Sequence, residues 1–141
     1  MTPEQKALVR DSFARILPNS ERMTARFYAR LFEIDPTARP LFQSSTKSVG
    51  RKLIDTMLAV LDSLDRLEHV VPLVWQLGKR HAAYGVRTSH FDSARVALLW
   101  ALEQEMGDAY TPETGAAWAE VYDLLAAAMK QAAAEREDSV S

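Results

Sequence analysis

The chain has 141 residues, of which 48% are hydrophobic and 26% charged, a composition typical of one globular domain. Its 17 Lys and Arg against 19 Asp and Glu give a formal net charge of −2, which argues against a nucleic-acid partner. The sequence contains no cysteine, which excludes disulfides, thiolate metal sites and cysteine nucleophiles.

Apolar residues recur at helical spacing along most of the chain, which predicts an all-α fold. The first helix should begin at Thr2-Pro3-Glu4-Gln5, a sequence typical of a capping box, and end before Pro18-Asn19. A second helix is predicted from Ser20 to Ile34. The stretch from Pro36 to Phe42 predicts a short helical turn at a corner, because Pro40 follows too closely for one regular helix.

The second half of the chain predicts four more helices. They run from about Lys47 to Leu64, from Val70 to Tyr84 with Gly85 as terminator, from about Phe91 to Met106, and from Thr111-Pro112 onward. The polar residues 135–141 predict a flexible tail after a domain of residues 1–134. No apolar run is long enough to cross a bilayer and the first residues lack a signal-peptide pattern, so we expect a cytoplasmic protein with no membrane partner.

His81 is the histidine with the most unusual position. His69 and His90 fall in predicted polar connections, whereas His81 lies on the apolar stripe of its helix. A helix can direct Nε2 inward while Nδ1–H donates to the carbonyl one turn earlier, here that of Leu77, and a neutral imidazole is a good iron ligand. The alternative is a core histidine satisfied by its neighbours, and the residue pattern alone favours that alternative.

Other side chains with chemical potential have simpler explanations. Tyr28 could donate a hydrogen bond to a small ligand, but a buried phenol more often donates to a main-chain carbonyl or water, and the same holds for Tyr84 and Tyr122. Glu103 and Glu105 are expected on a solvated helix surface. The chain has no glycine-rich phosphate loop, no paired zinc-binding histidines and no nucleophile elbow.

From about residue 4 to residue 129 the sequence resembles the globin family, most closely the neuroglobin-like and related single-domain bacterial globins. The residues that carry the resemblance are Phe27-Tyr28, Asp35-Pro36, Pro40-Leu41-Phe42, Arg51-Lys52-Leu53, Leu77-Gly78-Lys79-Arg80-His81, Thr111-Pro112, Ala116-Ala117-Trp118 and Tyr122. The resemblance implies a three-over-three helical globin fold that binds haem b.

The resemblance also implies roles for individual residues. It makes His81 the proximal ligand of the haem iron. It forms the distal pocket from Tyr28 as hydrogen-bond donor, Phe42 stacked on the haem, and the apolar side chains of Val49 and Leu53. The other residues implied to contact the haem are Lys52, Leu77, Arg80, Tyr84 and Val86.

Two departures from the family pattern affect the expected chemistry. Val49 stands where most relatives have a distal histidine or glutamine, and Gly50 would stand there if the register differed by one residue. Neither can ligate iron or donate from its side chain, so we expect an open or water-bound sixth position. Phe91 and Ala133 occupy positions where globins of the flavohaemoglobin type have a tyrosine and a glutamate that make the proximal histidine more electron-donating.

These implications predict a protein that reversibly binds oxygen, carbon monoxide or nitric oxide at ferrous iron, as in oxygen transport. The enzymatic alternative is a nitric oxide dioxygenase, which would use the same site and need an external reductase. A third alternative is a haem-free sensor or interaction module with the same fold, in which His81 is only a core residue.

Overall fold

The computed structural model describes residues 1–42, 46–66, 69–83 and 85–140, and all regular secondary structure in these ranges is helical. The elements in chain order are α1 (Pro3–Ile16), η1 (Leu17–Asn19), α2 (Ser20–Ile34), η2 (Pro36–Leu41), α3 (Thr46–Asp62), α4 (Val71–Ala83), α5 (Thr88–Met106), η4 (Gly107–Ala109) and α6 (Pro112–Val140). The all-α prediction is confirmed. None of the described helices combines the length and the apolar character needed to span a membrane.

Local signals in the sequence correctly placed both proline-led helix starts. At the start of α1, the Gln5 backbone N–H donates to Thr2 Oγ1 at 3.1 Å and the Thr2 backbone N–H donates to Gln5 Oε1 at 3.0 Å. At the start of α6, the Thr114 backbone N–H donates to Thr111 Oγ1 at 3.1 Å. These bonds satisfy backbone donors that the first turn of a helix leaves without partners.

Two helix ends differ from the sequence-based expectation. Helix α5 begins at Thr88, so Thr88, Ser89 and His90 form its first turn and not a polar connection. The imidazole makes this start possible, because His90 Nδ1 accepts a hydrogen bond from the Arg87 backbone N–H at 2.9 Å. The backbone of α6 stays helical to Val140, and the flexibility of residues 135–141 stays a prediction.

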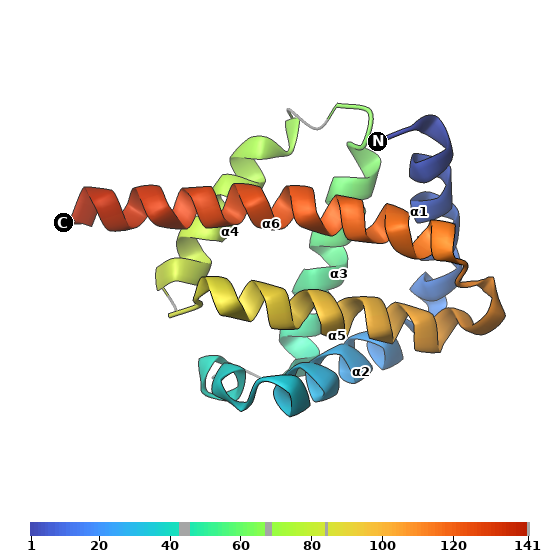
Figure 1. Ribbon diagram of the computed structural model, residues 1–141, viewed down its shortest axis with the longest axis horizontal. Helices are drawn as coiled ribbons and strands as arrows, with labels where there is room; N and C mark the ends of the chain where they lie inside the picture. Colours follow the sequence, from blue (N-terminus) through green and yellow to red (C-terminus); the bar gives the residue numbers. More distant parts are fainter. Residues whose placement is uncertain (43–45, 67–68, 84, 141) are drawn as a thin grey trace.

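The helices pack in crossing layers (Figure 1). Helices α5 and α6 pack side by side and cross in front of α3, and α6 also crosses in front of α4. Helix α2 packs on α5 and on α3, while α4 packs on α6 and α1 packs on the first half of α6. Helices α3 and α4 therefore depend on different neighbours for their positions.

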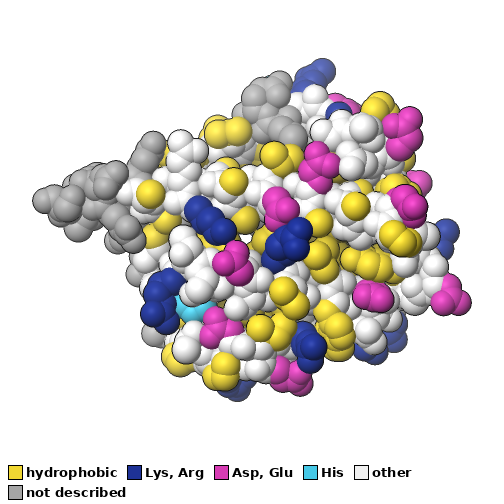
Figure 2. Space-filling model, viewed as in Figure 1, with side chains coloured by type: hydrophobic (Ala, Val, Ile, Leu, Met, Phe, Trp, Pro, Cys, Tyr) yellow, Lys and Arg dark blue, Asp and Glu magenta, His cyan; other side chains and the backbone are white. Residues whose placement is uncertain are grey.

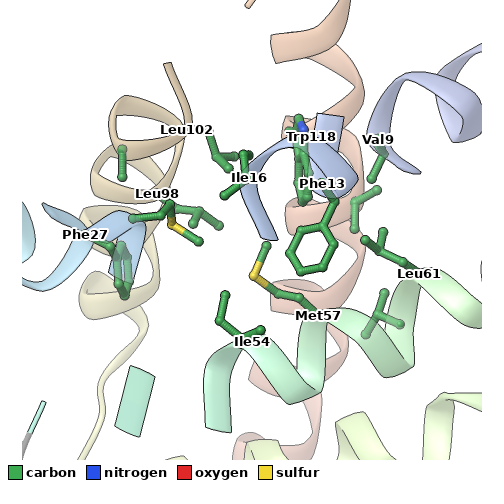
Figure 3. Close-up of a cluster of buried hydrophobic side chains, with 14 of the residues drawn as sticks. Val9, Phe13, Ile16, Phe27, Ile54, Met57, Leu61, Leu98, Leu102 and Trp118 are labelled. Carbon is green, nitrogen blue, oxygen red and sulfur yellow. The ribbon is translucent and has the colours of Figure 1, made fainter. Parts of the chain in front are cut away.

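The core forms where α1, α2, α3, α5 and α6 meet (Figure 3). The rings of Phe13 and Trp118 lie 6.2 Å apart, and Met57 of α3 points toward them. The indole N–H of Trp118 donates to Ser12 Oγ at 2.8 Å, and Ser12 Oγ in turn donates to the Leu8 carbonyl at 2.6 Å. The polar atoms at this point of the core are therefore hydrogen-bonded, as burial requires.

Glu105 is buried between two arginines, contrary to the expectation that it lies on a solvated surface. Its side chain is 2% exposed, and its carboxylate pairs with Arg22 at 2.8 Å and with Arg26 at 3.0 Å. The hydrogen bond to Glu105 raises the pKa of Arg22 above its ordinary value. Two cations from α2 thus compensate one buried carboxylate on α5.

The outer face of α5 and α6 has acidic and basic side chains interspersed (Figure 2). Arg95 Nε lies 2.8 Å from Asp123 Oδ1, and Lys130 Nζ lies 3.5 Å from Asp92 Oδ1. Exposed pairs of this kind add little stability. The contact between these two helices therefore depends mainly on apolar packing.

Gly78 is the point of closest approach between α4 and α6. A Cβ atom at residue 78 would lie 2.6 Å from the Met129 carbonyl oxygen and 2.9 Å from Ala132 Cβ. Only glycine fits this contact, because the nearest obstacle is backbone. Gly78 precedes His81 by less than one helical turn, so the contact also fixes the position of that histidine.

Overpacking a close contact usually costs about 1–3 kcal/mol, so after the gain in helix propensity we expect Gly78→Ala to destabilise the protein by up to about 2 kcal/mol. The gain in helix propensity is the roughly 1 kcal/mol by which alanine is favoured over glycine in a helix. Urea unfolding of the variant measures the difference. Gln76→Ala, an exposed substitution in the same helix, is the control and should leave the midpoint nearly unchanged. A Gly78→Ala protein as stable as the parent would contradict the packing described above.

Candidate functional site

His81 lies near the end of α4, half-buried, with its two ring nitrogens in different surroundings. Nδ1 lies 2.5 Å from the Leu77 carbonyl oxygen, one turn earlier. A carbonyl only accepts, so Nδ1 carries the proton and donates. In the neutral ring the lone pair is then on Nε2, where it is available to a metal. The predicted partner of Nδ1 is confirmed.

The backbone after His81 turns sharply toward α5. Gly85 has φ +90°, a left-handed conformation that glycine adopts without strain. The Val86 backbone N–H donates to the His81 carbonyl at 3.0 Å, which brings Val86 back beside the histidine. The predicted terminator at Gly85 is therefore confirmed.

Phe91 of α5 lies beside the imidazole. The ring centroids of His81 and Phe91 are 6.1 Å apart, with an angle of 35° between their planes. The Phe91 carbonyl accepts a hydrogen bond from the Tyr122 hydroxyl at 2.6 Å, which fixes this part of α5 against α6. Tyr122 thus has the main-chain partner that the simpler explanation predicted, and Phe91 offers the imidazole a surface without hydrogen-bonding groups.

Tyr28 belongs to an aromatic cluster on α2 and the corner that follows η2. Its ring lies 4.8 Å from Phe27, 6.3 Å from Phe32 and 5.2 Å from Phe42, measured between centroids. Phe32 and Phe42 lie 5.4 Å apart, edge to face. The structure therefore brings together Tyr28 and Phe42, two of the residues implied for a distal pocket.

The phenol of Tyr28 is a neutral donor. Only 5% of the residue is exposed, and burial raises the pKa of the phenol well above its ordinary value. Among the described residues its hydroxyl makes no hydrogen bond. A buried phenol in this state can donate to a small ligand but does not become a phenolate ligand of a metal at neutral pH.

The remaining predicted residues fall into three groups. Val49, Leu53, Leu77 and Val86 are half-buried, and the first two pack against the core. Lys52 and Arg80 are exposed on α3 and α4. Tyr84 lies outside the described residues.

The contacts of the predicted residues divide them into two sets. His81 and Leu77 lie with Phe91 on α4 and α5, while Tyr28 and Phe42 lie on α2 and the corner. Within the described ranges, ring contacts and hydrogen bonds join residues inside each set and none joins one set to the other. A groove of about 420 Å³ between α2 and α3, at Thr24 and Gly50, includes none of the predicted site residues.

The donors available for a metal are few. The described part of the chain holds no group of three or more histidine and carboxylate side chains that could bind a metal ion. His81 offers a single nitrogen. A porphyrin would itself occupy most of the coordination positions of its iron, so a single imidazole would suit haem iron better than a free ion, which needs several protein ligands.

His90 has a role that the sequence analysis missed. It is 5% exposed, with Nδ1 occupied by the Arg87 backbone N–H. Nε2 therefore carries the proton and donates to Thr37 Oγ1 at 3.1 Å. The Thr37 hydroxyl in turn donates to Asp35 Oδ1. The sequence signal for a cap at the start of α5 is a histidine in the third position of the helix. The second partner, Thr37 in η2, is too distant in sequence to be predicted.

Comparison with known proteins gives a consistent result. A family model described as Globin matches residues 25–129. The anaerobic nitrite reductase HBII of Casuarina glauca is 30% identical over an alignment of 144 positions. The alignment covers 92% of this chain and 90% of that protein. The flavohemoprotein of Bacillus subtilis is 27% identical over 122 residues, 84% of this chain but only 31% of that protein.

Two solved structures match nearly the whole chain. One is an engineered carbene transferase from Rhodothermus marinus, described as a candidate nitric oxide dioxygenase, with a TM-score of 0.89, 27% identity and coverage of 99% and 98%. The other is a bacterial globin from Campylobacter jejuni, with a TM-score of 0.84, 23% identity and coverage of 97% and 99%. These matches confirm the predicted fold.

The raised pKa of Tyr28 predicts a specific loss of stability in alkali. The folded state holds the phenolic proton more tightly than the unfolded chain, so this contribution is present below a pH of about 10 and is lost as the pH rises beyond it. In Tyr28→Phe, the free energy of unfolding should therefore fall less steeply between about pH 9 and about pH 11. Urea unfolding at both pH values measures the slope.

Tyr110→Phe is the matched control for this measurement. Tyr110 is only half-buried, and burial raises its pKa less than it raises that of Tyr28. Its removal should change the alkaline slope by a smaller amount. Equal slopes for the parent protein and Tyr28→Phe would show that the phenol is not buried in the folded protein.

Proposed function

Since this chain belongs to the globin family, we propose that it is a cytoplasmic protein that binds haem b through His81 and reversibly binds oxygen or another diatomic gas. Membership of the family implies haem binding. The observation that carries the assignment to His81 is its hydrogen bond to the Leu77 carbonyl. This bond leaves the Nε2 lone pair for an iron atom and fixes the direction of the ring.

The side chains that we assign to the haem pocket suit a large planar apolar group. Val49, Leu53 and Phe42 are half-buried side chains at the edge of the core, and a flat ring system between α3 and α4 would cover them. Lys52 and Arg80 are exposed on the two helices, where cations can pair with carboxylates at the rim of such a group. A bound haem would supply an iron atom that takes up diatomic gases.

We assign the distal side to Tyr28 as donor, with Val49 and Leu53 as apolar walls. Tyr28 is neutral and has no hydrogen-bond partner among the described residues, so it can donate, whereas valine can neither donate nor ligate. This combination favours an iron atom whose sixth position is open or holds water. It also makes Tyr28 the side chain that distinguishes a polar ligand such as oxygen from the less polar carbon monoxide.

Nitric oxide dioxygenase activity is the second candidate function. It is favoured by the structural similarity to the Rhodothermus marinus protein described as a candidate for that activity. Here the partner of His81 Nδ1 is a neutral carbonyl and not a carboxylate, which makes the imidazole a moderate electron donor. An external reductase would be required. Recovery of the ferrous spectrum that depends on added reductase during repeated nitric oxide addition would select this function.

His81→Ala tests the assignment of the iron ligand. We expect the variant to lose haem or its normal ligation, while circular dichroism shows most of the helicity retained, because only one half-buried side chain is truncated. Absorption spectra of the ferric, ferrous and carbonyl forms provide the measurement. His69→Ala, at an exposed position, is the control and should keep the parent spectrum. An unchanged spectrum in His81→Ala would reject His81 as ligand.

Tyr28→Phe tests the distal donor. Loss of one hydrogen bond of about 1–1.5 kcal/mol predicts roughly tenfold faster oxygen dissociation, with a much smaller effect on carbon monoxide. Stopped-flow ligand replacement measures both rates. Phe32→Leu, which changes the same aromatic cluster without removing a donor, is the control. Equal effects on the two gases would mean that Tyr28 acts only through packing.

A further inference from the structure

His90 is a buried imidazole whose two nitrogens are both used. Only 5% of the residue is exposed; Nδ1 accepts from the Arg87 backbone at 2.9 Å and Nε2–H donates to Thr37 Oγ1 at 3.1 Å. The first bond caps α5, and the second leaves α5 for η2. Helix capping needs only the first bond, whereas the second satisfies the buried Nε2–H and ties α5 to η2.

The bond to Thr37 is one part of a connection between η2 and the first turns of α5. Thr37 donates to Asp35 Oδ1 through both its hydroxyl and its backbone N–H. Ser93, one turn along α5, lies with its hydroxyl 3.3 Å from Asp35 Oδ2. The hydrogen bond from the Thr37 hydroxyl, with a smaller contribution from that of Ser93, lowers the pKa of Asp35. The carboxylate therefore stays charged and accepts both bonds. We call His90, Thr37 and Asp35 the His90 link.

Each end of the His90 link adjoins one of the two sets of site residues. On the α5 side, the next residue is Phe91, whose ring lies 6.1 Å from that of His81. On the η2 side, the element ends at Leu41, and Phe42 follows with its ring 5.2 Å from Tyr28. A shift of the corner relative to α5 would therefore displace either Phe42 or Phe91.

We propose that His90 is a positioning residue whose bond to Thr37 couples the corner bearing Phe42 to the orientation of the His81 imidazole through Phe91. The inference rests on the proposed function, because it takes His81 as the iron ligand. Tyr122 supports it independently, since its hydrogen bond to the Phe91 carbonyl at 2.6 Å leaves the first turns of α5 little freedom to adjust on their own.

Variants at Thr37 and His90 can break the link while sparing its surroundings. Thr37→Val removes the hydroxyl at nearly constant volume, and Thr37→Ser restores it. In His90→Asn the side-chain oxygen can still accept from the Arg87 N–H and cap α5, but nothing reaches Thr37. None of these substitutions touches His81, Tyr28 or Phe42.

The test is the iron–histidine stretching band in the resonance Raman spectrum of the ferrous haem protein. We expect Thr37→Val and His90→Asn to shift this band in the same direction and Thr37→Ser to return it to the parent frequency. Histidine ¹⁵N NMR of the carbonyl form should show the Nε2–H tautomer of His90 in the parent protein. The thermal midpoint of each variant separates a shift of the band from a general loss of stability.

The outcomes distinguish this inference from the function on which it rests. A band of unchanged frequency in Thr37→Val and His90→Asn would overturn the coupling while leaving His81 as the ligand. A His90 ring with the proton on Nδ1 would overturn it as well. Absence of an iron–histidine band from the parent protein would overturn the proposed function and the coupling together.

Discussion

The hydrogen bond between His81 and the Leu77 carbonyl determines which nitrogen of the imidazole can act as a ligand. Without it, either ring nitrogen could carry the proton and the ring could rotate. With it, one nitrogen is a donor, the other holds a lone pair, and the ring keeps one orientation on α4. The acceptor is a backbone atom in the same helix, so this arrangement depends on little more than the helix itself.

The position of that helix depends on a second constraint, the close contact of α4 with α6 at Gly78. Helix α4 packs on α6, whereas α3 packs on α2, so the two helices are positioned separately. The core is a continuous cluster of buried side chains from α1, α2, α3, α5 and α6, and the polar atoms of Ser12 and Trp118 within it are hydrogen-bonded.

Local signals in the sequence predicted most of the fold and the hydrogen-bond partner of His81 Nδ1. The caps at Thr2 and Thr111, the turn at Gly85 and the Leu77 partner of His81 all involve residues within a few positions of each other. His90 and Glu105 were misjudged because their partners lie 53 and 83 residues away. The sequence marks such residues only as polar, and tertiary packing decides whether they are exposed.

The arrangement around Glu105 also constrains how this sequence can change over evolutionary time. The arginine side chains are 59% and 41% exposed, so either can become fully hydrated if the carboxylate is replaced by an apolar group. Replacement of one arginine is more costly, because the Glu105 carboxylate, whose side chain is 2% exposed, would then pair with one cation instead of two. The less costly order of substitution therefore begins with the carboxylate. Lineages that lose this charged cluster should replace Glu105 before either Arg22 or Arg26.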